Sequence, residues 1–135
     1  MGRALGCQND PMDEIRWFNP SQPDTLRNAV ILGYIEAVLT LLRLGSLSSL
    51  SRIPLPILFL ACAAIGAGAV GCASERKAGY ALAVGGTAVV VVAYAIQVLR
   101  IGGITLAMIP LMFAGALLWL LLHDQTRDYQ RVWFR

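Results

Sequence analysis

Charged residues are scarce in this chain, and their scarcity decides the class of protein. Only 14% of the 135 residues are Asp, Glu, Lys or Arg, whereas 57% are hydrophobic. Soluble domains of this size carry about a quarter charged residues. The deficit in this chain is too large to attribute to a generous hydrophobic core. Together with a mean hydropathy of +0.64, this composition predicts a membrane protein whose main partner is the lipid bilayer. The 11 Lys and Arg residues are dispersed between apolar runs, so no nucleic-acid partner is expected.

Groups that bind metals or perform catalysis are also few. The chain has one histidine, His123, and three cysteines, Cys7, Cys62 and Cys72, with no CxxC pair. Cys62 and Cys72 would lie about 15 Å apart along the axis of one helix, which exceeds the reach of a disulfide. The sequence contains no Ser-His-acid set and no phosphate-binding glycine loop. We therefore expect no enzymatic activity, no metal site and no other cofactor.

Four apolar segments are each long enough to form a transmembrane helix, which needs about 20 residues. These segments are residues 26–44, 53–73, 78–99 and 101–122. Helices are expected because an open strand would leave backbone groups unpaired in lipid, and the short connections favour antiparallel neighbours. The predicted fold is therefore all-α: an antiparallel four-helix transmembrane bundle over residues 26–122, with short interfacial segments at residues 1–25 and 123–135.

The distribution of basic residues predicts the orientation in the membrane. Eight Lys and Arg residues lie on the side that would hold both termini, and three, Arg43, Arg52 and Arg100, lie on the other side. The loops that carry the excess of basic residues usually stay in the cytoplasm. We therefore expect a multi-pass protein of the cell membrane with both termini in the cytoplasm.

Small residues at a spacing of four predict where the helices approach one another, because helix association in lipid depends on close packing. Such lines are Ala63, Ala67 and Gly71, then Ala64 and Gly68, in the second segment, and Ala81 and Gly85 in the third. Since the second segment carries two lines, we expect it to lie at the centre of the bundle.

One carboxylate, Glu36, lies near the middle of the first segment, in the stretch GYIEAVLTLLR. A charged carboxylate at that depth costs at least about 2–3 kcal/mol, so Glu36 is expected to face the bundle or to carry a proton. Thr40 and Arg43 lie about 40° and 20° from Glu36 around the helix axis and form a candidate polar site with it. Two interpretations are open: a neutral carboxyl that hydrogen-bonds to Thr87 or another group across the bundle, or the proton-binding group of a small transporter.

Aromatic and basic residues near both ends of the chain predict contact with lipid headgroups. The N-terminal stretch RWFNPSQPDTLRNAV has an aromatic pair before a proline-rich turn, and the tail HDQTRDYQRVWFR forms an amphipathic helix if it is helical. The predicted interfacial anchors are Trp17, Phe18, Tyr129, Arg131, Trp133 and Phe134. We expect the two ends to pack together. The alternative role of the tail is to dock a partner protein.

The stretches FNPSQPDTLRNAV, ERKAGYALAV and LLLHDQTRDYQRVWFR together resemble a group of small bacterial four-helix membrane proteins without an assigned activity. The resemblance covers most of the chain and implies the four-helix topology, but no catalytic role. From the residues themselves we expect an accessory or scaffolding subunit of a membrane complex, in contact with a membrane-protein partner or with further copies of itself. The alternative function is a small proton-coupled transporter that uses Glu36.

Overall fold

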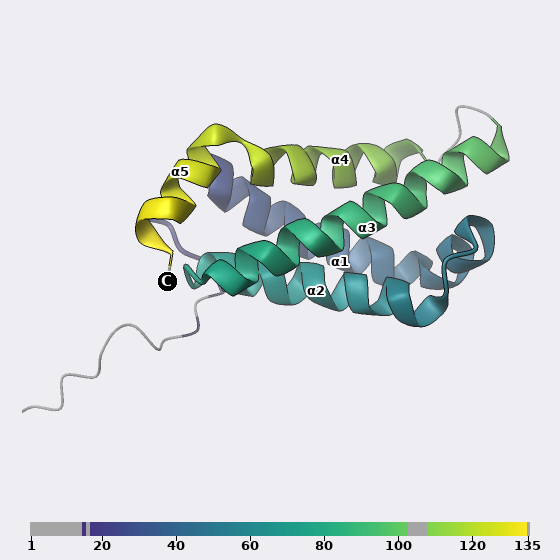
Figure 1. Ribbon diagram of the computed structural model, residues 1–135, viewed down its shortest axis with the longest axis horizontal. Coiled ribbons are helices and arrows are strands. Elements are labelled where there is room, and N and C mark those ends of the chain that lie inside the picture. Colours follow the sequence, from purple (N-terminus) through teal and green to yellow (C-terminus); the bar gives the residue numbers. More distant parts are fainter. Residues whose placement is uncertain (1–14, 16, 103–107, 135) are drawn as a thin grey trace, which may run out of the picture.

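The computed structural model describes residues 15, 17–102 and 108–134, which contain five helices (Figure 1). The helices are α1 (Asp24–Ser51), α2 (Leu55–Ala73), α3 (Lys77–Ile101), α4 (Met108–Leu122) and α5 (Asp124–Trp133). Neighbouring helices run antiparallel from α1 to α4, and α5 turns across the end of the bundle where the N-terminal segment and the α2–α3 turn also lie. This end is termed the terminal end, and the opposite one the distal end. The predicted all-α antiparallel fold is confirmed.

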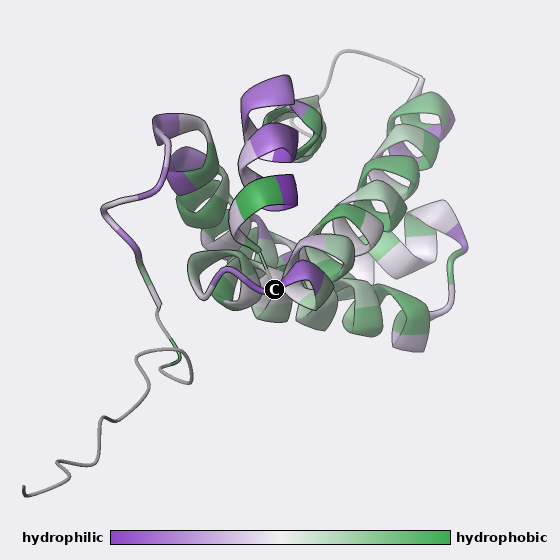
Figure 2. Ribbon diagram, turned by 60° about the vertical axis from the view of Figure 1, so that its left-hand side comes forward, coloured by the Kyte–Doolittle hydropathy of each residue, from purple (hydrophilic) through white to green (hydrophobic). Residues whose placement is uncertain are grey.

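The helices are long and apolar enough for a membrane. α1, α2 and α3 each qualify as a span, and α4 qualifies only together with α5, from which it is bent by 51°. The described residues thus provide three candidate spans, or four if the bent pair is one span. Hydrophobic residues run along these helices, whereas α5 is mostly hydrophilic (Figure 2). By the length and composition of its helices, the chain is a multi-pass membrane protein.

The end of the first helix differs from the sequence prediction. α1 continues to Ser51, whereas the sequence predicts an end at Leu44. The serines are accommodated because their hydroxyls bond to the helix backbone; Ser51 Oγ, for example, donates to the Leu47 carbonyl at 2.6 Å. α1 ends where Arg52 adopts a positive φ of 59°. The start of the fourth predicted segment cannot be compared, since residues 103–107 lie outside the described residues.

Glycine allows α2 and α3 to form the most extensive helix contact of the bundle. A Cβ atom on Gly71 would collide with the backbone of Gly79, and a Cβ atom on Gly68 would collide with the backbone of Ala83. Backbones this close are typical of helix pairs that associate by van der Waals packing in lipid. This contact aligns α3 along α2 and thereby fixes which face of α3 points into the bundle.

The predicted lines of small residues are only partly correct. Ala64 does face α3, because a Cβ atom on Gly86 would lie 3.1 Å from its Cβ. Four of the predicted residues are instead exposed: Ala63, Ala67, Ala81 and Gly85. The second helix is central only in part: it forms the two most extensive helix contacts, with α3 and α1, but α1 and α3 each pack against all three other helices of α1 to α4. Small residues occur on several faces of these helices, so their spacing does not select the buried face.

Candidate functional site

Glu36 lies on the inward face of α1, and its side chain is completely buried, with 0% exposed. Thr40, one turn further along and equally buried, donates a hydrogen bond from Oγ1 to Glu36 Oε1 at 3.3 Å. Among the described residues, no group bonds to the other carboxyl oxygen, Oε2. The carboxyl is thus satisfied on one side only, by its own helix.

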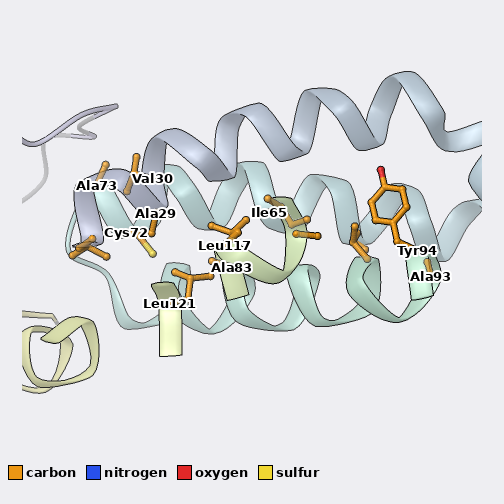
Figure 3. Close-up of a cluster of buried hydrophobic side chains, with 14 of the residues drawn as sticks. Ala29, Val30, Ile65, Cys72, Ala73, Ala83, Ala93, Tyr94, Leu117 and Leu121 are labelled. Carbon is orange, nitrogen blue, oxygen red and sulfur yellow. The ribbon is translucent and has the colours of Figure 1, made fainter. Parts of the chain in front are cut away.

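Tyr94 of α3 reaches the same region from across the bundle. Its side chain is completely buried, and its ring points from α3 towards α1 in Figure 3. Glu36, Arg43 and Cys62 act electrostatically on its hydroxyl, and the Thr40 hydroxyl is its neighbour. Within the described part of the chain, this hydroxyl also has no hydrogen-bond partner. Tyr94 therefore adds a second unpaired oxygen close to the carboxyl.

The other predicted members of this site, Thr87 and Arg43, do not bond directly to the Glu36 carboxyl. Thr87 is completely buried, but its Oγ1 has no partner among the described residues, so the predicted hydrogen bond between Glu36 and Thr87 is not formed. Arg43 is partly buried, and its charge acts on the Glu36 carboxyl without a direct ion pair in the part of the chain described. The structure thus joins Glu36 to Thr40 and brings in Tyr94. The sequence suggests Tyr94 only as an aromatic surface for the transporter interpretation and not as a polar partner of Glu36, although Tyr94 follows Thr87 by two helical turns on the same face.

Gln97 continues the polar line on α3. Its side chain is only 6% exposed, and its Oε1 has no partner within the described residues. Helical geometry places Thr87, Tyr94 and Gln97 within about 80° of one another around α3. Buried polar groups are normally paired, so these unpaired oxygens need an explanation. The residues Glu36, Thr40, Thr87, Tyr94 and Gln97 are termed the α1–α3 polar seam.

A second polar cluster lies at the terminal end and centres on Glu75, in the α2–α3 turn. Glu75 Oε1 accepts hydrogen bonds from Asn19 Nδ2 at 3.1 Å and from the Tyr129 hydroxyl at 2.9 Å. Its φ of 57° is uncommon for a residue with a side chain. The two ends of the chain thus contact each other through a residue that the sequence does not distinguish from an ordinary connector.

The N-terminal segment is held against the bundle by further contacts. Asn19 Oδ1 accepts a bond from the Ser21 amide at 3.1 Å, which forms the tight turn before α1. Gln22 Nε2 donates to the Cys72 carbonyl at 2.8 Å, and the Tyr34 hydroxyl donates to the Trp17 carbonyl at 2.9 Å. The segment therefore packs on α1 and on the end of α2.

Side-chain contacts also hold α5 and the residue after it against the terminal end. Burial, then the hydrogen bond to Glu75 and the negative charge of that group, raises the pKa of Tyr129 to about 12. Phe134 packs edge-on against Tyr129 and Tyr80, with ring centroids 6.2 and 6.4 Å apart. Since only 3% of Phe134 is exposed, it is a packing residue and not the interfacial anchor that the sequence predicts. The other predicted anchors that remain exposed are Trp17, Phe18, Arg131 and Trp133; their contact with lipid stays a prediction.

Comparison with known proteins identifies no relative: no family model, curated protein or solved structure matches the chain. Among the described residues, no group of three or more His, Cys, Asp or Glu side chains is arranged to hold a metal ion. The resemblance of the sequence to small four-helix membrane proteins therefore identifies no family.

Proposed function

We propose that the chain is an accessory or scaffolding subunit of a membrane complex and that it presents a fixed surface at its terminal end to a membrane-protein partner. The observation that supports this function is the position of Glu75. Its carboxylate bonds to Asn19 and Tyr129 and so joins the N-terminal segment, the α2–α3 turn and α5. A surface that is ordered before binding loses less conformational entropy when a partner docks.

The outward side of this terminal end has the composition of a docking surface. Trp17 is 69% exposed, and Trp133 and Val132 of α5 are 61% and 74% exposed. Arg127 and Arg131 are exposed on the same helix. Tryptophan and arginine contribute most strongly to protein interfaces, where their large side chains are desolvated. We propose that this surface contacts a partner at the membrane boundary.

Co-purification in a mild detergent tests this function. With the wild-type chain we expect a partner in a fixed ratio, and with the double variant Arg131→Ala/Trp133→Ala we expect its loss. Leu42→Ala is the matched control, because Leu42 is 77% exposed on α1, away from the terminal end. Recovery of self-associated chain alone, or equal recovery of the partner with both variants, would contradict the proposed surface.

The alternative function, a small proton-coupled transporter, is favoured by the buried Glu36 and its unpaired Oε2. Transport would require this carboxyl to release and rebind a proton in each cycle. Proton flux into liposomes that contain the purified chain tests this requirement. If Glu36→Gln transports protons as fast as the wild type, the carboxyl is not the coupling group.

A further inference from the structure

The interior of the bundle changes character along its length. In the half near the terminal end, side chains of α1, α2, α3 and α4 line a small cavity of about 10 Å³, which has room for about one water molecule. Its lining is apolar and includes Val30, Ile65, Ala83, Leu117 and Leu121 (Figure 3). Among the described residues, this apolar lining separates the polar groups at the terminal end from those in the middle of the bundle.

From the middle of the bundle towards the distal end, the interior contains polar side chains beside apolar ones such as Leu58 and Val90. Glu36 and Thr40 lie on α1, and Tyr94 and Gln97 lie on the inward face of α3. Gln97 is in the last two turns of α3, which ends at Ile101 near the distal end. Buried oxygens that are unpaired among the described residues occur on both sides of the apolar lining: those of Gln22 and Thr25 at the terminal end, and those of Glu36, Thr87, Tyr94 and Gln97 beyond it. The polar groups nearest to Glu36 therefore continue towards the distal end.

Among the described residues, no cation forms an ion pair with the Glu36 carboxyl. Arg43 on the same helix is the cation that acts on the carboxyl, and it lies about 10 Å away along the axis. The facing groups on the neighbouring helices are Cys62 of α2, whose thiol donates to the Ala37 carbonyl at 3.1 Å, and Tyr94 of α3. The described part of α4 contributes no titratable side chain. A carboxylate in this setting lacks the pairing that buried charges require.

A protonated carboxyl fits the same setting. Its second oxygen then becomes a hydrogen-bond donor, and the neighbouring Tyr94 hydroxyl is an acceptor that no other described group uses. The Thr40 hydroxyl continues to donate to Oε1. Both carboxyl oxygens and the tyrosine hydroxyl would thereby be satisfied without any charge in the hydrocarbon.

We infer that Glu36 is a proton-binding site. At neutral pH its Oε2 carries the proton and donates to the Tyr94 hydroxyl, while the Thr40 hydroxyl donates to Oε1. The proton exchanges with water through the distal half of the polar seam. On release, the proton passes to a water molecule, and the electron pair stays on the carboxylate. This inference goes beyond the scaffolding function and does not require the proton to cross the membrane.

Infrared spectroscopy of the purified full chain in phosphatidylcholine vesicles tests the site. A protonated carboxyl has a carbonyl stretching band that a carboxylate lacks. An ordinary glutamate, with a pKa of about 4.3, is ionised to more than 99% at pH 7. We expect the band at pH 7 in the wild type and in Glu75→Gln, its loss in Glu36→Gln, and its return at a shifted frequency in Glu36→Asp. A wild-type chain without the band at pH 7 would overturn the inference.

Three substitutions test the partners and the route of the proton. Tyr94→Phe removes the acceptor, so it should shift the band, and an unchanged frequency would exclude Tyr94 as a partner. Gln97→Leu should slow hydrogen–deuterium exchange of the band by about tenfold. Thr87→Val, on the terminal side of Tyr94, should leave the exchange rate unchanged; equal effects of the two would refute the distal route. Circular dichroism shows whether each variant is folded, and the band is measured independently of partner binding.

Discussion

Tyr129 shows how much of the terminal end depends on single side chains. Its hydroxyl donates to Glu75 Oε1 at 2.9 Å, and a hydrogen bond to a charged group contributes about 1.5–3 kcal/mol. Because the site is partly exposed, we expect Tyr129→Phe to cost no more than the lower end of this range. Amide exchange in α5 should accelerate by roughly tenfold. Val132→Ala is the control, since Val132 is 74% exposed; unchanged exchange in Tyr129→Phe would show that the hydrogen bond does not hold α5.

The same tyrosine predicts how α5 responds to alkali. Its pKa is raised to about 12 in the fold, whereas a free tyrosine has a pKa of about 10. The folded state therefore favours the protonated hydroxyl, and its contribution to stability is complete below pH 10. This contribution should decrease as the pH rises from about 10 through 12. In the wild type, amide exchange in α5 should accelerate over this range by more than the pH effect common to all amides. In Tyr129→Phe it should follow that common effect alone.

At the scale of helices, glycine positions on α2 and α3 predict opposite responses to the same substitution. A Cβ atom on Gly71 would collide with the backbone of Gly79, whereas one on Gly85 would meet nothing within 4 Å. Gly71→Ala should destabilise the bundle by about 1–3 kcal/mol or more, because the backbones must move apart. Gly85→Ala should be neutral or stabilise it by up to about 1 kcal/mol, because alanine favours the helix.

Unfolding of the purified chain in mixed detergent micelles measures this difference. Both variants add one methyl group to a helix, so they share the same change in composition and differ in surroundings alone. Equal stability of Gly71→Ala and Gly85→Ala would mean that the close contact of α2 and α3 does not exist in the membrane protein.

The helices themselves were predictable, but their contacts were not. Apolar runs with few charges predict helices in lipid whatever their neighbours are, which is why α2 and α3 appear close to their expected bounds. The extension of α1 to Ser51 depends on hydroxyl-to-backbone bonds that compensate for a polar sequence. The inward face of α3 depends on which glycines meet α2. For this reason Glu36 was identifiable from the sequence as a buried carboxyl, whereas Tyr94 was not identifiable as its neighbour.

The contacts at the terminal end depend on the fold of the whole molecule. Glu75 bonds to residues 56 and 54 positions away in the chain, so no local pattern reveals it. Only the alternating direction of the helices brings the N-terminal segment, the α2–α3 turn and α5 to one end. The same arrangement gathers Arg76, Lys77, Arg127 and Arg131 there, and leaves Arg43, Arg52 and Arg100 in the distal half.

This distribution of charge predicts the orientation of the whole bundle, with the terminal end in the cytoplasm. Single cysteines in a chain whose native cysteines are replaced by serine can report it, at the exposed positions Ser49 near the distal end and Gln125 at the start of α5. In intact cells, a membrane-impermeant maleimide should label Ser49→Cys, and should label Gln125→Cys only after the membrane is opened. The reverse pattern would invert the orientation. Labelling of both from outside would leave an odd number of crossings, so that α1, α2 and α3 would span the membrane and the bent α4–α5 pair would not.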